Sequence, residues 1–194
     1  MMMKKVWLFA VALFCGAVMA ADNWLPNAGF AAGVPVTAVK MNYFRSRSLV
    51  LDPQILPEDW DLTAAGKVEF TAGSAGIRDV DGGGKSFSFA TPGNKWGSVQ
   101  LFCQREFSYA DISGNRLAVS VRAKGSGTLL ILANVESNGE KTLFVLQRFE
   151  LTGQWQQFNI RRWNIPKRSY DFAKLGFAIY GTGEITSPQV SVAQ

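Results

Sequence analysis

From residue 67 onward the sequence predicts an all-β fold, either a sandwich or a barrel. Short segments in which apolar and polar residues alternate recur about every ten residues, a spacing typical of such folds. Clusters of Gly, Asn, Asp and Ser separate these segments, and no stretch shows a convincing helical period. With no internal repeat or low-complexity linker in view, we expect a single domain over residues 21–194.

The expected strands follow from this alternation. They are Lys67–Thr71, Lys85–Thr91, Gly97–Gln104, Arg116–Lys124, Thr128–Glu136, Lys141–Glu150, Trp155–Trp163, Leu175–Tyr180 and Gln189–Ala193. Asn138-Gly139 between alternating segments is the strongest hairpin signal in the chain. Inward positions on three strands should form one core between two sheets: Leu117, Val119 and Val121; Phe87 and Phe89; Leu175, Phe177 and Ile179.

Residues 31–66 give a weaker signal. Residues 31–35 resemble a loop, and residues 42–51 are compatible with a strand or with an ordered excursion. Asp52-Pro53 and Leu56-Pro57 are expected to interrupt regular structure, because the residue before a proline is restricted.

The N-terminus predicts a secretory signal peptide over residues 1–20. Lys4 and Lys5 precede a short apolar run, and Val18-Met19-Ala20 fits the small-x-small rule for cleavage after Ala20, with Ala21 as the alternative position. The apolar run is too short for a membrane span of about 20 residues, and no second span follows. The protein should therefore be secreted or periplasmic after cleavage.

Composition excludes several function classes. Removing residues 1–20 of the 194 leaves 174 and lowers the formal charge from +5 to +3, because that segment carries two lysines and no acid. The basic residues are scattered, so a nucleic-acid partner is not expected. The sequence has no His, which excludes Ser-His-Asp and Cys-His catalysis and His-ligated zinc. Cys103 remains as a single thiol, expected to face inward on a strand.

A series of phrases along the chain resembles the carbohydrate-binding modules of families 4 and 9. The first is Asn23-Trp24-Leu25-Pro26-Asn27-Ala28-Gly29-Phe30, similar to the opening strand of those modules. The later phrases, in the same order as in the family, are Pro57–Trp60, Gly83–Phe89, Val99–Phe107 and the "leu-thr-x-x-trp-gln-x-phe" phrase at Leu151–Phe158. The resemblance implies a two-sheet antiparallel β-sandwich of the galactose-binding-like jelly-roll type.

The resemblance also implies that the protein binds a glycan in a shallow groove on the concave sheet. A pyranose packs its C–H face on an aromatic ring and offers hydroxyls to Gln, Asn and Arg. The family often places an aromatic-glycine pair at the start of a concave strand, and Trp96-Gly97 matches it. Alternation then places Gln100 and Gln104 on the face of Trp96. By the same strand parity, further candidates on neighbouring strands are Asn134, Arg148, Lys174 and Tyr180. Arg162 and Trp163 are candidates for the rim of the groove.

Structural roles compete with binding roles for these residues. Trp96 follows a turn and has the alternative of packing over one end of the sandwich. Gln100 and Gln104 have the alternative of being solvated polar positions. Trp155 matches a position usually buried in the family and is expected in the core, and Trp60 is expected as a structural plug.

The family's structural calcium site is expected to be lost. Its two acids correspond here to Ala31 and to the segment Ser187–Val192, which carries no carboxylate. We therefore expect no cofactor, and we expect the calcium site to be absent or rebuilt from other groups.

The sequence is compatible with three classes of function. The leading hypothesis is a secreted, non-catalytic glycan-binding protein. The alternative is an exported module of the same fold that docks a partner protein. An enzyme is not expected, because hydrolysis needs two carboxyls across a groove and nothing in their spacing pairs Glu106, Glu136 and Glu150.

Overall fold

A computed structural model gives the fold of this protein. It describes residues 23–41, 48–65, 75–90, 98–115, 117–163, 165 and 169–192. The predicted signal peptide and the expected strand Lys67–Thr71 lie outside these residues. Within the described residues, no helix has the length and apolar character needed to cross a membrane.

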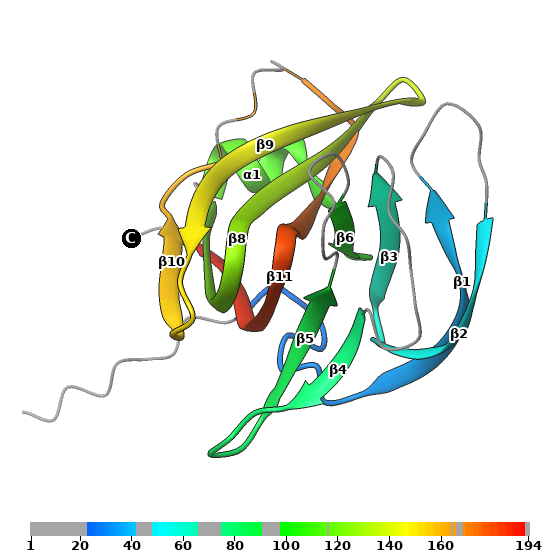
Figure 1. Ribbon diagram of the computed structural model, residues 1–194. Helices are drawn as coiled ribbons and strands as arrows, with labels where there is room; N and C mark the ends of the chain where they lie inside the picture. Colours follow the sequence, from blue (N-terminus) through cyan, green and yellow to red (C-terminus); the bar gives the residue numbers. More distant parts are fainter. Residues whose placement is uncertain are drawn as a thin grey trace, which may run out of the picture.

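The described chain is a two-layer β-sandwich with one short helix, and its strand pairs are antiparallel except for β1 with β3 (Figure 1). Its elements are β1 (Gly33–Met41), β2 (Ser48–Pro57), β3 (Trp60–Ala65), β4 (Ala75–Asp79), β5 (Lys85–Ala90), β6 (Ser98–Cys103), β7 (Phe107–Ser108), α1 (Tyr109–Asn115), β8 (Leu117–Ser137), β9 (Glu140–Leu151), β10 (Gln156–Ile160) and β11 (Phe172–Val192). The fold class expected from the sequence is confirmed.

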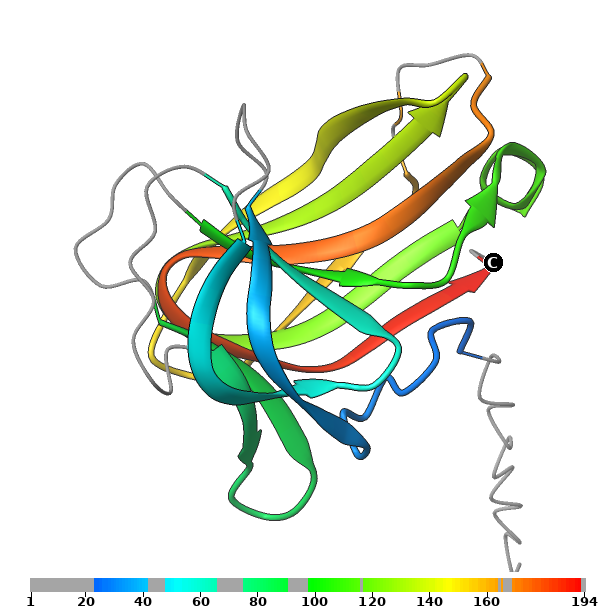
Figure 2. The same ribbon diagram turned by 90° about the vertical axis from the view of Figure 1, so that its right-hand side faces the viewer.

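Two long strands, β8 and β11, run through both layers. Their segments 128–137 and 172–180 join β9, β6, β3, β1 and β2 in what we call the front layer. Their segments 117–124 and 182–192 join β10, β5 and β4 in the back layer. Figure 2 shows β11 passing along one layer in orange, bending, and returning along the other in red. Four of the expected strands are therefore two continuous ones.

The bend occurs where Gly127 of β8 pairs with Gly181 of β11. Both residues have positive φ, +123° and +115°. A Cβ on Gly127 would collide with the carbonyl of Tyr180, and a Cβ on Gly181 would collide with that of Ser126. Only glycine allows the two strands to turn this corner while remaining hydrogen-bonded.

The core between the layers consists of the inward positions that alternation predicts. Phe87, Phe89, Val121, Phe177 and Ile179 all have no exposed surface. Rings pack edge to face within it, with centroids of Phe87 and Phe89 4.9 Å apart. Each such side chain contributes about 1.5–3 kcal/mol by leaving water.

Cys103 has the inward position expected of it. It is fully buried, and burial raises the pKa of its thiol to about 11. The predicted Asn138-Gly139 hairpin is also present. Both turn residues have positive φ, and Ser137 pairs with Glu140 across them.

The structure corrects the expectation of irregular chain between residues 31 and 57. Residues 33–35 begin β1, and Pro53 lies inside β2. Pro53 falls at a register shift opposite the Val36–Ala38 segment, so its missing N–H interrupts no ladder bond. Pro35 lies where β1 has β2 on one side only, since β1 meets β3 at Lys40 and Met41.

Two further expectations are wrong. Trp155 is partly exposed instead of buried in the core, with the Lys124 ammonium 4.9 Å and the Arg122 guanidinium 5.7 Å from its ring. Helix α1 was not expected, although Ser108 and Asp111 form a capping box. The Asp111 carboxylate accepts from the Ser108 N–H at 2.8 Å, and the Ser108 hydroxyl accepts from the Asp111 N–H at 3.2 Å.

Candidate functional site

A hollow of about 530 Å³ lies on the outer face of the front layer, which is turned away from the back layer. We call it the front hollow. It is lined by residues from β1, β2, β3, β6, β8, β9 and β11 and from the chain after β6: Val34, Leu56, Trp60, Asp61, Leu62, Thr63, Phe102, Gln104, Glu106, Asn134, Glu136, Lys141, Phe172 and Lys174. Its volume is within the range of about 300–1,000 Å³ typical of small-ligand sites.

The floor beside the front hollow is apolar. Phe102 pairs with Gly176 of β11, and its ring lies where a Cβ on Gly176 would be. Phe102, Leu130, Leu132 and Ala178 form a second buried cluster, separate from the main core, with exposed fractions of 4%, 3%, 1% and 0%. Outward positions at the centre of this layer are therefore buried as completely as inward ones.

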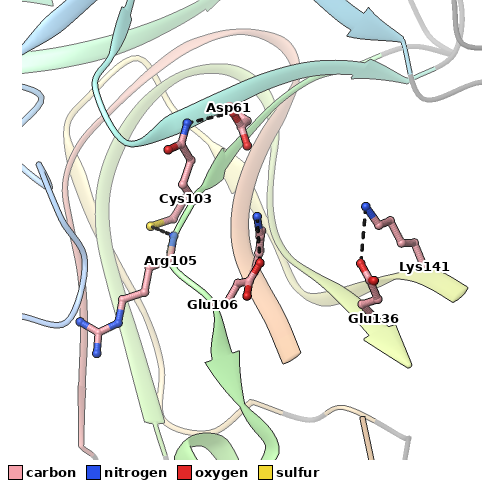
Figure 3. Close-up of polar contacts among 8 residues, drawn as sticks. Asp61, Cys103, Arg105, Glu106, Glu136 and Lys141 are labelled. Carbon is pink, nitrogen blue, oxygen red and sulfur yellow. Dashed lines mark hydrogen bonds and ion pairs between the residues drawn. The ribbon is translucent and has the colours of Figure 1, made fainter. Parts of the chain in front are cut away.

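The wall of the front hollow is charged. Gln104 Nε2 donates to Asp61 Oδ1 at 3.0 Å. The Lys174 ammonium lies 3.4 Å from the Glu106 carboxylate, and the Lys141 ammonium lies 3.5 Å from the Glu136 carboxylate (Figure 3). Three carboxylates and two ammonium groups thus line one hollow, together with the amides of Gln104 and Asn134.

Three residues expected in a binding groove do meet here. Gln104 follows β6, Asn134 lies on β8 and Lys174 on β11, and β-pairing places Lys174 directly opposite Asn134. Alternation along each strand had placed them on the outer face, and the sheet order brings them together.

Other predicted site residues lie elsewhere. Gln100 is on the predicted face, but it is only 3% exposed and accepts a hydrogen bond from the Thr63 hydroxyl at 3.4 Å. Tyr180 is 37% exposed, opposite Thr128 near the corner. Arg148 is exposed on β9 opposite Leu130. Trp96 lies outside the described residues.

Trp163 does not lie on a rim, which corrects the expectation. It is 5% exposed and packs edge to face on Phe107, with ring centroids 5.3 Å apart. Arg162, its expected companion on the rim, is exposed but lies away from the front hollow, between β9 and β10.

Several lining residues were missed by sequence analysis. Phe102 lies within the uninterrupted apolar run of β6, whose six residues are all buried, so alternation does not single it out as outward-facing. Asp61 carries no motif and becomes visible only because β3 pairs with β6, which sets it opposite Phe102.

The fold brings together two of the three glutamates whose spacing in the sequence showed no pairing. Glu106 and Glu136 line the same hollow, each in an ion pair with a lysine. Glu150 instead accepts a hydrogen bond from the Thr128 hydroxyl at 3.0 Å. Among the described residues, no three His, Cys, Asp or Glu side chains are grouped as a metal site would require.

No protein-family model matches this sequence, and no curated protein matches it either. Among solved structures, similar chains include the C-terminal family 22 carbohydrate-binding module of Clostridium thermocellum Xyn10B, at 18% identity and a TM-score of 0.48, covering 70% of this chain and 86% of that one. Another is the family 11 module of the Clostridium thermocellum cellulase Lic26A-Cel5E, at 13% identity and a TM-score of 0.47, covering 70% and 88%.

A third is the enzymatically active domain of tailspike protein 4 from bacteriophage CBA120, at 11% identity and a TM-score of 0.48. The match covers 70% of this chain but only 19% of the tailspike chain. These are distant likenesses between β-rich chains. The finer assignment to families 4 and 9 stays a prediction.

Proposed function

We propose that this protein is a non-catalytic glycan-binding protein and that the front hollow is its binding site. The observation that carries the proposal is the composition of the hollow. The amide groups of Gln104 and Asn134 and the carboxylate of Asp61 line the same hollow as Phe172, which is partly exposed, and Phe102, which is 4% exposed.

This composition suits a saccharide. The hydroxyls of a sugar need both donors and acceptors, which an amide supplies in one planar group, and carboxylates add further acceptors. The C–H face of a pyranose packs on apolar and aromatic surface. For a shallow site we expect about −4 to −7 kcal/mol of binding free energy, hence dissociation constants of roughly millimolar to ten micromolar.

Binding without catalysis fits the acids of the hollow. Hydrolysis uses one carboxyl as a proton donor and a second as nucleophile or base. Here Glu106 and Glu136 are each paired with an ammonium group. An assay of mixed polysaccharides should show no new reducing ends, and their appearance would contradict this part of the proposal.

The direct test compares two double variants. Gln104→Ala/Asn134→Ala removes both amides from the hollow, and Gln154→Ala/Gln157→Ala removes two exposed amides outside it. Retention should be measured on affinity gels containing xylan, mixed-linkage β-glucan or other soluble polysaccharides. We expect the first variant to lose binding at least about fivefold (about 1 kcal/mol) with an unchanged Tm, and the second to bind as the parent does. Equal retention of both variants would remove the front hollow from the binding site.

Trp96 is a separate part of the proposal, based on the aromatic-glycine pair Trp96-Gly97. Trp96→Ala should abolish retention on the same gels and leave the melting temperature nearly unchanged. Unaltered retention would exclude Trp96 from the site without affecting the proposal for the amides.

A second function, docking of a partner protein, is favoured by one observation. Leu143 and Val145 point outward from β9 and are 45% and 41% exposed, beside the row that contains Asn134. A blank glycan array together with capture of a stable partner, lost in Leu143→Ser/Val145→Ser, would replace the glycan proposal by this one.

We also propose export, with the mature chain starting after Ala20. The charge, apolar run and small residues of the first 20 positions support it. The mass of the protein recovered outside the cytoplasm should lack these residues, and Ala20→Arg should block the cleavage. Recovery of the full-length chain from the cytoplasm would contradict export.

A further inference from the structure

A second cleft opens on the side of the sandwich, between the edge strand of each layer. β9 pairs with the front segment of β8 and β10 with its back segment, and the short connection 152–155 joins the two. Figure 1 shows β9 and β10 neighbouring each other at the left of the molecule. Near the connection the gap is filled by Phe149 and Phe158, whose ring centroids are 4.7 Å apart. Farther along lies a hollow of about 570 Å³, which we call the side cleft.

The side cleft has an apolar floor and a polar rim. Leu146, Phe149 and Ile160 supply the apolar surface, and Gln147, Asn159, Arg161 and Arg162 supply the rest. Phe149 is half-buried, so part of its ring remains available to a ligand.

No described residue forms an ion pair with the arginines of this cleft. Among the described residues, Arg161 and Arg162 are exposed and take part in none of the ion pairs, side-chain hydrogen bonds or cation–ring contacts. By contrast, Lys85, Lys124, Lys141 and Lys174 each face a carboxylate, and Arg105 and Arg122 lie over aromatic rings.

We propose that the side cleft binds an acidic glycan, a chain bearing carboxylate or sulfate groups. A guanidinium group offers a planar pair of N–H donors that matches a carboxylate or sulfate, and Arg161 and Arg162 both line this cleft. Asn159 and Gln147 offer amides for hydroxyls, and Phe149 with Leu146 offers apolar surface for a ring face. An inorganic anion alone would use neither the amides nor the apolar floor.

The side cleft and the front hollow share no lining residue. That hollow carries three carboxylates against two ammonium groups and faces a different side of the molecule. The two sites therefore differ in the charge of the ligand they select.

The experiment compares four probes by calorimetry on the mature chain at 50 mM and 300 mM NaCl. They are a galacturonic acid hexamer (carboxylate), a heparin-derived hexasaccharide (sulfate), a neutral xylohexaose and a short DNA duplex. The key variant is Arg161→Gln/Arg162→Gln. The control, Lys85→Gln/Arg122→Gln, removes the same charge from the back layer. We expect the parent protein to bind at least one of the two acidic hexasaccharides. The affinity should fall at least tenfold in the key variant and less than twofold in the control. Comparing the affinities for the carboxylate-bearing and sulfate-bearing hexasaccharides then shows which anion the cleft prefers.

A substitution that leaves the net charge unchanged distinguishes binding of a saccharide from binding of any polyanion. Asn159→Ala should weaken the acidic hexasaccharide about threefold and leave any DNA binding unchanged. The proposal is overturned if the key variant and the control lose the same affinity, or if the key variant loses none while its melting temperature is preserved. It is also overturned if DNA binds as tightly as the saccharides, or if Asn159→Ala leaves the affinity for the acidic hexasaccharide unchanged. The front-hollow variant Gln104→Ala/Asn134→Ala should leave acidic binding intact, so either site can fail without the other.

Discussion

The two halves of β8 follow the same pleat but face different environments. In the back half, Val119, Val121 and Ala123 are buried while Ser120 and Arg122 remain at the surface, a regular alternation. In the front half, the five residues from Leu129 to Ala133 are all buried. The back layer is thus a sheet with one face in the core and one in water, whereas the centre of the front layer is buried on both faces. An outward face that is apolar at its centre and charged at its margin is the setting in which we place ligand binding.

The corner between the halves should be the most sensitive point. Gly127→Ala places a methyl group against the Tyr180 carbonyl at a positive φ, and we expect a loss of about 3 kcal/mol in the free energy of unfolding. Chemical denaturation measures it. Gly153→Ala is the matched control, because that glycine has open space around its Cβ position and should change stability by less than about 0.5 kcal/mol. Similar stabilities of the two variants would contradict the role of the corner.

The outward leucines of the front layer provide the next test. Leu132→Ala should cost about 2–3 kcal/mol although the residue faces away from the core, because it is 1% exposed. Ser120→Ala, outward on the back half of the same strand, should cost less than about 0.5 kcal/mol. If both substitutions are equally mild in denaturation curves, the outer face of the front layer is not packed as described.

The pH dependence of stability in alkali tests the burial of Cys103 on the inward side of the front layer. Burial raises the pKa of Cys103 from 9.0 to about 11, so the folded state retains a proton that the unfolded chain loses above pH 9. Stability from this group is complete below pH 9 and lost by pH 11, a fall of about 2 kcal/mol.

The control for this titration is Cys103→Ala, whose stability should fall less over the same range. Tyr170 contributes at higher pH, because burial, and then the nearby Tyr109 and Asp111, raise its pKa to about 12. Identical slopes between pH 9 and 11 in both proteins would contradict a buried, protonated thiol.

The smallest expected effect concerns calcium. Because Ala31 and the Ser187–Val192 segment supply no carboxylate, we expect neither calcium nor a chelator to shift the melting temperature by more than about 1 °C. A clear stabilisation by calcium would show that other groups had rebuilt the site.

Much of the sandwich follows from local pattern. The strands around Asn138-Gly139, the inward sets on β5, β8 and β11 and the buried Cys103 were all predicted from alternation and turn chemistry. Pattern failed where tertiary context overrode it. Pro53 is accommodated by a register shift, and Trp155 is partly exposed, with two cations from β8 against its ring.

The candidate site was predictable only in part. Gln104 and Asn134 were expected on the correct face, because parity along a strand is a local property. Asp61 and Phe102 were not expected, since their meeting depends on β3 lying beside β6. Trp163 was expected at a rim and is buried against Phe107, a partner more than fifty residues away in the sequence.

The sequence alone determined the all-β class, the turns, the inward position of Cys103 and the absence of His, because composition and period-two alternation can be read from the chain without knowing which strands are neighbours. Tertiary structure decided which outward faces are buried, which acids share a hollow with which lysines, and that Arg161 and Arg162 line one cleft with no ion pair to a described carboxylate. These depend on the order of strands across a sheet, and hydrogen bonds between distant segments set that order.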